Sequence, residues 1–247
     1  QGKLREESQL AIELYRRLLE LKIEDSYLPL LATHLPSFAK RFAQGNHILQ
    51  FEDLLRDWAI FEKLFQEASS VISEYFPSDG SKLEKIPLQS LKKAAKAWYQ
   101  YSPLHPTASE IGVGWETLSL CLKAAFHPIL TKHSEALSSF NQDSWRRRTC
   151  PICGGKPDIA FLSKDNGARW LVCSRCDTEW LFFRLECPFC GNRDQDSLAY
   201  LTDKKELYRL YTCEQCRSYI KAIDLRRAED EILLPLERVL TLDMDRQ

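Results

Sequence analysis

The cysteines are the residues of this 247-residue chain whose spacing could support chemistry. Eight of the nine lie between residues 150 and 216 and form four Cys-x-x-Cys pairs: Cys150/Cys153, Cys173/Cys176, Cys187/Cys190 and Cys213/Cys216. The gaps between successive pairs are 19, 10 and 22 residues, so the short middle gap divides the series into two groups of four. Two thiolates in a tight turn can face one ion, and a second pair completes a tetrahedron. The spacing therefore predicts two four-thiolate metal sites.

The segments between the pairs predict the β-hairpins that would bring the cysteines together. Residues 157–172 alternate between polar and apolar positions around an Asn-Gly turn signal, and residues 197–212 repeat the plan. Gly154 and Gly191 each follow the second cysteine of a pair, where a positive φ favours glycine. These features are typical of tandem rubredoxin-like or zinc-ribbon modules.

The cysteine pattern leaves the identity and the role of the metal open. Four thiolates suit zinc and also mononuclear iron. Disulfides are disfavoured in a reducing compartment. A redox-active Cys-x-x-Cys pair normally opens a helix in a βαβ unit, whereas all four pairs here lie next to predicted hairpins. We therefore expect two ions, iron or zinc, each bound by four cysteines.

The region before the cysteines has helical periodicity from Lys3 to about Phe140. Thr107 and Glu110 have the spacing of a capping box at a helix start. The sequence Ser-Asp-Gly-Ser at 78–81 predicts a break between helices. Besides the first helix and one that begins near Phe51, the predicted helices are 28–43, 87–101 and 107–140.

The predicted fold class is α+β, with an all-α helical bundle followed by two ribbon modules. The expected boundaries are 1–145 for the helical domain, 146–186 for the first four-cysteine ribbon, 187–225 for the second, and 226–247 for a C-terminal tail. A chain of this length corresponds to one or two ordinary domains.

The remaining reactive side chains form no recognisable catalytic constellation. The five histidines are isolated or lie next to prolines, and the ninth cysteine, Cys121, shares a helix face with apolar residues. The Arg-Arg-Arg run at 146–148 is either a solvated linker, which we favour, or an anion-binding patch. We therefore predict no catalytic residues.

Several apolar residues lie close to the predicted metal sites. Ile152 and Phe189 occupy the turns between paired cysteines, and we expect them to be exposed beside the metal. Trp170, Trp180 and Tyr219 would form either an aromatic seam or ordinary ribbon core. The exposed turns would then offer a surface for a partner protein.

The composition excludes several classes of function. The chain has 34 basic and 35 acidic residues, and a net charge of −1 does not favour nucleic-acid binding. Apolar residues at 44% and charged residues at 28% are ordinary for a globular protein. No apolar run reaches the roughly 18 residues needed to span a membrane. We expect a cytoplasmic protein without a membrane span.

The residues around the cysteine pairs are more specific than their spacing. The chain has Cys-Pro-Ile-Cys-Gly at 150–154, Cys-Ser-Arg-Cys-Asp-Thr-Glu-Trp at 173–180, and Cys-Glu-Gln-Cys-Arg-Ser-Tyr-Ile-Lys at 213–221. With the third pair at 187–190, this region resembles the FdhE family of formate dehydrogenase accessory proteins, in which a helical domain precedes four Cys-x-x-Cys motifs. The third pair, Cys-Pro-Phe-Cys, is more apolar than in some members.

The resemblance implies a non-enzymatic cytoplasmic maturation factor. Such a protein would bind the molybdenum- or tungsten-containing catalytic subunit of a respiratory formate dehydrogenase before export, and carry iron in rubredoxin-like sites. By the same resemblance, one ion would be bound by Cys150, Cys153, Cys173 and Cys176, and the other by Cys187, Cys190, Cys213 and Cys216. The alternatives are an iron-transfer or redox protein acting on the same client, and a nucleic-acid-binding zinc-ribbon protein.

Overall fold

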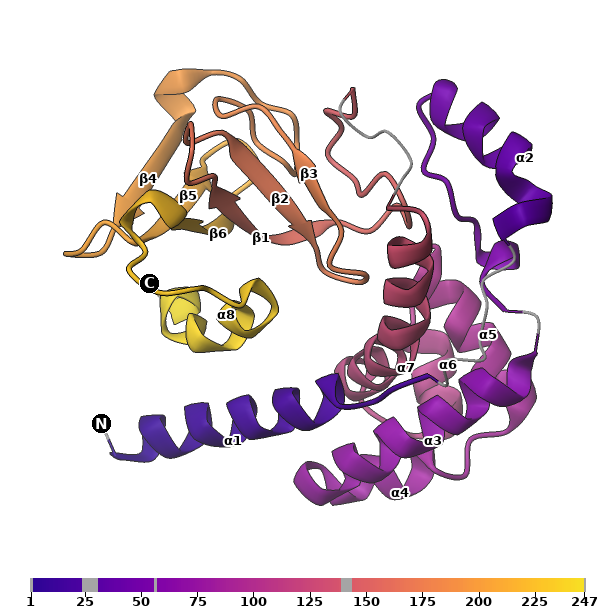
Figure 1. Cartoon of the computed structure of the whole chain (residues 1–247). Helices are drawn as coiled ribbons and strands as arrows, with labels where there is room; N and C mark the ends of the chain where they lie inside the picture. Colours follow the sequence, from indigo (N-terminus) through magenta and orange to yellow (C-terminus); the bar gives the residue numbers. More distant parts are fainter. Residues whose placement is uncertain (1, 24–30, 56, 139–143, 247) are drawn as a thin grey trace. The chain divides into compact units, whose positions relative to one another are not determined.

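A computed structural model describes residues 2–23, 31–55, 57–138 and 144–246. The helices are α1 (Gly2–Leu19), α2 (Leu31–Ala43), α3 (Trp58–Tyr75), α4 (Pro77–Leu83), α5 (Leu88–Tyr99), α6 (His105–Ile111), α7 (Trp115–Ala136) and α8 (Leu234–Leu240). The strands are β1 (Pro157–Leu162), β2 (Arg169–Cys173), β3 (Glu179–Leu181), β4 (Leu198–Thr202), β5 (Tyr208–Cys213) and β6 (Ser218–Asp224). Helices followed by a six-stranded sheet confirm the predicted α+β class (Figure 1).

The described residues divide into two compact units, one within 1–31 and 49–133 and the other within 32–48 and 134–247. The first unit is helical and has an aromatic core. The rings of Phe61 and Phe126 lie 4.3 Å apart, and Trp98 stacks on Phe126 at 5.2 Å. Aromatic side chains at helical spacing bury large apolar areas, which explains why these segments pack as helices.

Cys121 belongs to the core of the first unit, as its sequence context predicted. It is fully buried, and its Sγ lies 3.2 Å from the Oγ of Ser69. Burial raises the pKa of the Cys121 thiol to about 12. A buried neutral thiol of this kind acts as a small apolar side chain.

The break predicted at residues 78–81 is wrong, because these residues form most of α4. The chain bends before these residues, at Phe76, and Pro77 starts the new helix. Gly80 permits the bend, since a Cβ there would lie 2.3 Å from the Cα of Ser73 on α3. The glycine therefore marks close helix packing rather than a loop.

The helix predicted at 107–140 is divided into α6 and α7. Gly112 ends α6 in the left-handed conformation, with φ of 70°. The predicted capping box is also wrong, because α6 starts at His105 and the buried Thr107 lies inside it. The predicted helix 28–43 corresponds to α2, and residues 28–30 and 139–140 lie outside the described residues.

The second unit contains one six-stranded sheet with strand order β3-β2-β1-β6-β5-β4. The first hairpin contributes β1 and β2, the second contributes β4 and β5, and neighbouring strands are antiparallel except at the centre. There β1 and β6 pair in parallel, with Ile159 opposite Lys221 and Leu162 opposite Asp224. The segments predicted as tandem ribbons therefore share one sheet.

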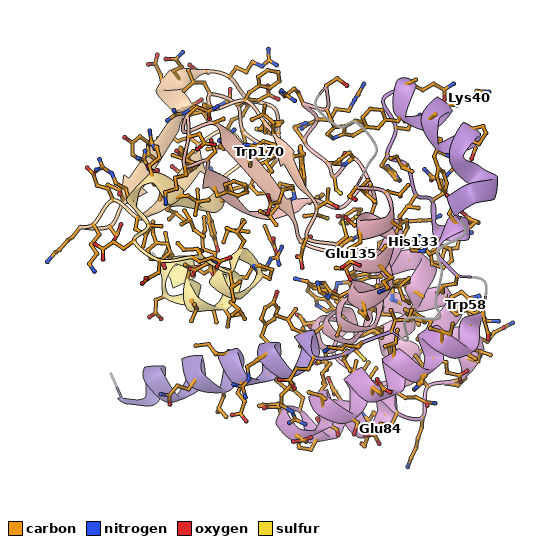
Figure 2. The ribbon with its side chains drawn as sticks, in the orientation of Figure 1. Lys40, Trp58, Glu84, His133, Glu135 and Trp170 are labelled. Carbon is orange, nitrogen blue, oxygen red and sulfur yellow. The ribbon has the colours of Figure 1, made fainter. Side chains whose placement is uncertain are left out.

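One face of this sheet carries a hydrophobic cluster next to α8. Ile159, Phe161, Val172 and Ile223 are buried there. The partly buried residues packed against them, from the sheet, the chain before α8 and α8 itself, are Trp170, Leu207, Tyr208, Leu225, Ile232 and Leu234. Trp170 projects from β2 (Figure 2) and stacks on Phe161 at 6.1 Å. The C-terminal segment thus contributes to the core that supports both hairpins.

Candidate metal centres

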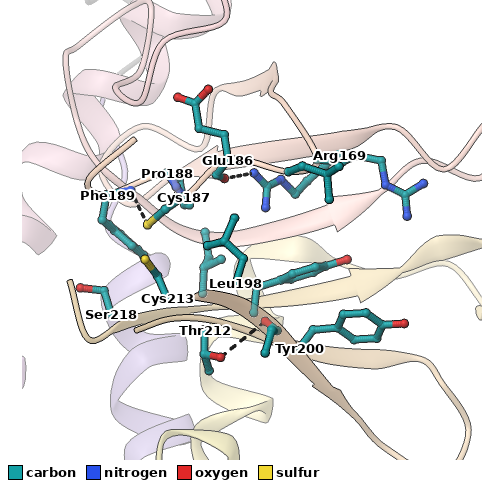
Figure 3. A pocket seen from close by; sticks show the side chains of 15 residues that line it. Arg169, Glu186, Cys187, Pro188, Phe189, Leu198, Tyr200, Thr212, Cys213 and Ser218 are labelled. Carbon is teal, nitrogen blue, oxygen red and sulfur yellow. Dashed lines mark hydrogen bonds between the residues drawn. The ribbon is translucent and has the colours of Figure 1, made fainter. Parts of the chain in front are cut away.

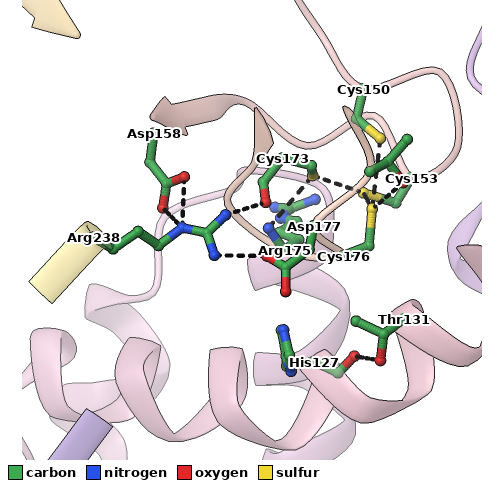
Figure 4. A network of polar contacts seen from close by, with 11 residues as sticks. His127, Thr131, Cys150, Cys153, Asp158, Cys173, Arg175, Cys176, Asp177 and Arg238 are labelled. Atoms are coloured by element: carbon green, nitrogen blue, oxygen red, sulfur yellow. Dashed lines mark hydrogen bonds and ion pairs between the residues drawn. The ribbon is translucent and has the colours of Figure 1, made fainter. Parts of the chain in front are cut away.

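The first four-cysteine cluster brings together Cys150, Cys153, Cys173 and Cys176 (Figure 4). All four are buried, and their sulfur atoms lie within 4.8 Å of one another. The Sγ of Cys153 lies 3.4 Å from the Sγ of Cys173 and 3.5 Å from the Sγ of Cys176. Sulfur atoms placed about 2.3 Å from a central ion in a tetrahedron are separated by slightly less than 4 Å. The four sulfur positions therefore suit a tetrahedral zinc or iron ion.

The second cluster brings together Cys187, Cys190, Cys213 and Cys216. The sulfur of Cys187 lies 3.6 Å from that of Cys216, and the sulfur of Cys190 lies 3.7 Å from that of Cys213. Cys187 and Cys213 are buried, whereas Cys190 and Cys216 are half-buried. The donor set is the same as in the first cluster, but one side of it meets solvent.

Each Cys-x-x-Cys turn is followed by a residue with a positive φ. Gly154 and Gly191 have φ of 70° and 81°, as the sequence predicted. Asp177 and Arg217 occupy the equivalent positions with φ of 56° and 54°. The turn closes in the same way in both modules, since the N–H of Gly154 donates to the carbonyl of Cys150 and that of Gly191 to Cys187. This backbone turn directs both thiols of a pair to the same side.

The pKa values of the thiols in the first cluster are shifted in different directions. Burial raises the pKa of Cys153 and of Cys176 above the ordinary thiol range. Burial opposes ionisation of Cys173 too, but hydrogen bonds from the neighbouring thiols and from the backbone N–H of Arg175 lower its pKa. One thiolate is therefore stabilised by the other thiols. A cation is required to hold four thiolates in this buried space.

Two further residues support the first cluster: Thr178, which belongs to the motif at 173–180, and Arg238, which lies outside every predicted motif. Arg238 on α8 donates to Asp158 at 2.9 Å, to Asp177 at 2.6 Å, and to the carbonyl of Cys173 at 2.8 Å (Figure 4). Thr178 places its Oγ1 3.0 Å from the Sγ of Cys176. Such outer contacts orient metal ligands and affect metal affinity. No periodicity or spacing connects Arg238 with cysteines more than sixty residues earlier.

The second cluster has a different set of outer contacts. The side-chain amide of Asn192 donates to the Sγ of Cys213 at 3.6 Å and to Ser197 at 2.6 Å. Burial acts to raise the pKa of Cys213, but hydrogen bonds from the backbone of Cys216 and from Asn192 lower it to about 6. The buried Arg169 donates to the carbonyls of Phe183 and Glu186 and so fixes the chain that leads into Cys187 (Figure 3).

The apolar residues in the Cys-x-x-Cys turns of the two modules, Ile152 and Phe189, differ in their burial. Ile152 is fully buried, so the prediction that it is exposed is wrong. The reason is that the first turn is covered by residues 46–48, where the N–H of Ile48 donates to the carbonyl of Pro151 at 2.9 Å. Phe189, in the corresponding turn of the second module, is half-buried. Of these two turns, only the one between Cys187 and Cys190 therefore offers an apolar side chain to the surface.

The three aromatic residues predicted as seam or core have separate environments. Trp180 is buried in the sheet and donates from Nε1 to the carbonyl of Arg147 at 2.8 Å. Trp170 stacks on Phe161 in the hydrophobic cluster. Tyr219 is exposed, and its hydroxyl donates to Asp245 at 2.8 Å. The tryptophans thus support the sheet, in agreement with the ribbon-core interpretation.

The histidines described by the structure lie in varied surroundings. In the first unit, His105 packs against Trp115 at 5.0 Å and the Nε2 of His133 lies 3.3 Å from the carbonyl of Leu54. In the second unit, His47 lies beside Gly154. Burial and the nearby charges of Arg175 and Arg41 lower the pKa of His47, which favours its neutral form. The side chain of His34 lies outside the described residues.

Within the described part of the chain, no helix combines the length and the apolar composition that a membrane crossing requires.

Comparison with known proteins gives a consistent family. The family model for the central domain of FdhE matches residues 149–184, which include the whole first cluster. A relative named Protein FdhE homolog from Aquifex aeolicus (strain VF5) is 32% identical over 211 residues, covering 83% of this chain and 70% of that relative.

Two further comparisons concern a shorter sequence match and the fold. The Protein FdhE homolog of Haemophilus influenzae (strain PittGG) is 35% identical over 74 residues, which cover 29% of this chain and 24% of that protein. The crystal structure of the FdhE protein from Pseudomonas aeruginosa superposes with a TM-score of 0.59 at 22% identity, covering 94% of this chain and 80% of that chain. With the shared fold and the long match to the Aquifex relative, the chain belongs to the FdhE family.

Proposed function

We propose that this protein is a non-enzymatic cytoplasmic assembly factor that binds the catalytic subunit of a formate dehydrogenase. Each four-cysteine cluster would hold one zinc or iron ion. Family membership supports the link to formate dehydrogenase. The observation that carries the proposal within this molecule is an exposed apolar surface beside the second cluster.

That apolar surface is formed by Leu185, Phe189 and Tyr200, which line one cavity. Leu185 and Tyr200 are 59% and 54% exposed. The cavity has a volume of about 80 Å³, and Cys187 and Cys213 contribute to its wall (Figure 3). Large apolar side chains grouped at a surface are typical of protein interaction sites.

The edge strand of the sheet, β4, contributes to the wall of the same cavity. β4 is the last strand in the sheet order and four of its five residues are exposed. An edge strand presents unpaired backbone groups to which an extended segment of a partner can bind. The apolar surface and β4 together would allow a client to contact the protein next to the second metal centre.

Capture of the client tests the proposal directly. The tagged protein would be purified under anaerobic conditions from its own host during synthesis of formate dehydrogenase. We expect the catalytic subunit to copurify. Leu185→Glu places a charge in the apolar surface and should reduce the captured subunit by roughly tenfold, the effect of losing an interface hot spot.

A matched control variant is Leu233→Glu, because Leu233 is 60% exposed but lies next to α8. We expect it to capture the client as the unmodified protein does, with both proteins retaining their metal. Absence of the catalytic subunit from the unmodified eluate while the host makes the enzyme would contradict the proposal. Equal losses with both variants would reject the apolar surface as the contact.

A second candidate function is delivery of the second ion to the client. The half-buried Cys190 and Cys216 favour it, because an incoming ligand can reach an ion on that side. Under this function the ion is iron. Protein recovered after client binding would retain the ion of the first cluster and would have lost the ion of the second. Metal analysis before and after mixing with the client separates delivery from stable binding.

A further inference from the structure

The arginine run at 146–148 is solvated, with Arg147 and Arg148 exposed, but it lies within the second unit rather than in a linker between domains. Arg146, Arg147 and Arg148 line a cavity of about 600 Å³ in the second unit, together with Lys156. Glu186 is the acidic residue in the wall, and its carboxylate is already paired with Arg193 at 2.7 Å. Basic and acidic residues are balanced over the whole chain, so this concentration of positive charge is local.

Neighbouring contacts hold the arginine side chains in place. The guanidinium of Arg147 lies over the ring of Trp145 at 5.4 Å, and that ring stacks on Phe42 at 5.2 Å. Arg148 donates to the carbonyl of Phe189 at 2.7 Å. Guanidinium groups that are held in this way lose little conformational entropy when they bind an anion.

Gly45 contributes to the same arrangement. Its φ of +77° is typical of glycine, and a Cβ at this position would lie 1.9 Å from a terminal nitrogen of Arg147. The loop before the first cluster therefore leaves room for the guanidinium at the cavity wall.

The cavity has both polar and apolar walls. Thr149 and Lys156 flank the first Cys-x-x-Cys turn, while Pro188 and Phe189 belong to the third. Small-molecule sites commonly have volumes of about 300–1,000 Å³ and combine apolar walls with a few polar groups. Guanidinium groups match phosphate oxygens through paired hydrogen bonds.

We propose that this cavity binds a small organic phosphate with at least two negative charges. The phosphate groups would contact Arg147, Arg148 and Lys156, and the organic part would lie against Pro188 and Phe189. An acidic peptide is less well matched, because its carboxylates carry one charge each and are spread along an extended chain. The proposal is independent of the client, since it concerns a ligand of the isolated protein.

Calorimetric titration of the full-length, metal-loaded protein with ADP, inorganic pyrophosphate and adenosine tests this site. We expect saturable binding of ADP and pyrophosphate, and none of adenosine. Arg147→Gln should weaken ADP binding by about tenfold to a hundredfold, the effect of one charge-assisted hydrogen bond. The backbone carbonyl of Arg147, which accepts from Trp180, is retained in this variant.

Lys156→Gln approaches the cavity from a different segment and should also weaken binding. The matched control is Arg227→Gln, which removes an exposed arginine paired with Glu206 outside the cavity. We expect the control to bind ADP as the unmodified protein does, and all variants to retain both metals. Salt should weaken binding without abolishing the difference between Arg147→Gln and the control.

Four outcomes would overturn the proposal. The first is no binding of ADP or pyrophosphate to the metal-loaded protein, and the second is an equal loss with Arg227→Gln. The third is loss of metal rather than of anion binding in Arg147→Gln, which would mean that the arginines only balance the charge of the thiolates. The fourth is binding of a glutamate-rich peptide in place of the phosphates.

Discussion

The two four-cysteine clusters have the same ligands and the same backbone turns but different surroundings. The first cluster is buried, and α8 reaches it through Arg238. The second has two half-buried cysteines, an apolar surface beside it and an edge strand next to it. A repeated motif therefore produces one enclosed centre and one that is accessible from outside. We interpret the first as structural and the second as the centre that faces a partner.

The shared sheet explains how one centre can be accessible without being unstable. β6 pairs in parallel with β1 and antiparallel with β5, so β6 joins the second hairpin to the first through the middle of the sheet. The hydrophobic cluster around Phe161 and Ile223 includes residues from both hairpins. The enclosed first module can thus stabilise the exposed second one.

The largest difference between the centres is expected when a ligand pair is removed. Cys173/Cys176→Ser should abolish the first site and unfold its hairpin, because a structural ion contributes about 10–16 kcal/mol of apparent binding energy in small zinc modules. Cys187/Cys190→Ser should release only the second ion and leave the first in place. Metal stoichiometry by native mass spectrometry and circular dichroism would check both. Two retained ions and normal folding in Cys173/Cys176→Ser would refute the ligand assignment.

A smaller effect is expected from Asp224, where the two modules are joined. Its carboxylate is fully buried and pairs with Arg209 at 2.7 Å and Arg226 at 2.6 Å. Hydrogen bonding to Arg226 lowers the pKa of Asp224 below its ordinary value of 3.8. Asp224→Asn should lower the free energy of unfolding by about 3 kcal/mol, the effect of breaking a buried pair. Both centres should be destabilised together in a thermal melt that follows each metal.

The pH dependence of this effect has a definite sign. Because the folded pKa is lowered, the stabilisation by Asp224 is fully present above its ordinary pKa of 3.8 and is lost as the pH falls through the folded value. The difference between the unmodified protein and Asp224→Asn should therefore be constant near neutral pH and shrink in acid. A difference that grows in acid would contradict the ion-pair account.

The outer contacts of the two centres should affect only their own ions. Asn192→Ala removes the amide that donates to Cys213 and should weaken the second site by about tenfold. Thr178→Val removes the hydroxyl beside Cys176 and should weaken the first site to a similar extent. Competition with a metal indicator would measure both affinities. Equal loss at both sites in either variant would mean that the centres are not independent.

The smallest expected difference is kinetic. A chelator should remove metal in two phases, with the second site emptied first, because Cys190 and Cys216 meet solvent while all four cysteines of the first site are buried. Stopped-flow absorbance of the chelator complex would show the phases. The fast phase should persist in Thr178→Val and be further accelerated in Asn192→Ala. A single phase would remove the kinetic distinction between the centres.

The sequence predicted the chemistry of the centres better than their environments. The pairing of cysteines, the hairpins and the positive φ of Gly154 and Gly191 follow from local spacing and turn preferences. The burial of Ile152 does not, because its cover comes from residues 46–48, far away in the sequence. The contact of Arg238 with the first cluster is equally remote.

The helical unit gives the same lesson. The helix predicted to begin near Phe51 is present as α3 but starts later, at Trp58, because residues 51–53 form a separate 3-10 turn and Asp57 caps the helix. The Ser-Asp-Gly-Ser sequence at 78–81 predicts a break because glycine and serine favour turns, whereas the small size of Gly80 serves the contact between α3 and α4. Composition alone does not distinguish these two uses of glycine.

Hydrogen–deuterium exchange of the protein alone and in complex with the formate dehydrogenase catalytic subunit tests most directly which metal centre faces the client. We predict protection of residues 183–202, which contain the apolar surface, the third cysteine pair and β4. Residues 150–176 of the first centre should exchange equally in both states. Protection of residues 150–176 with no change at residues 183–202 would contradict the assignment of the second centre as the one that faces the client.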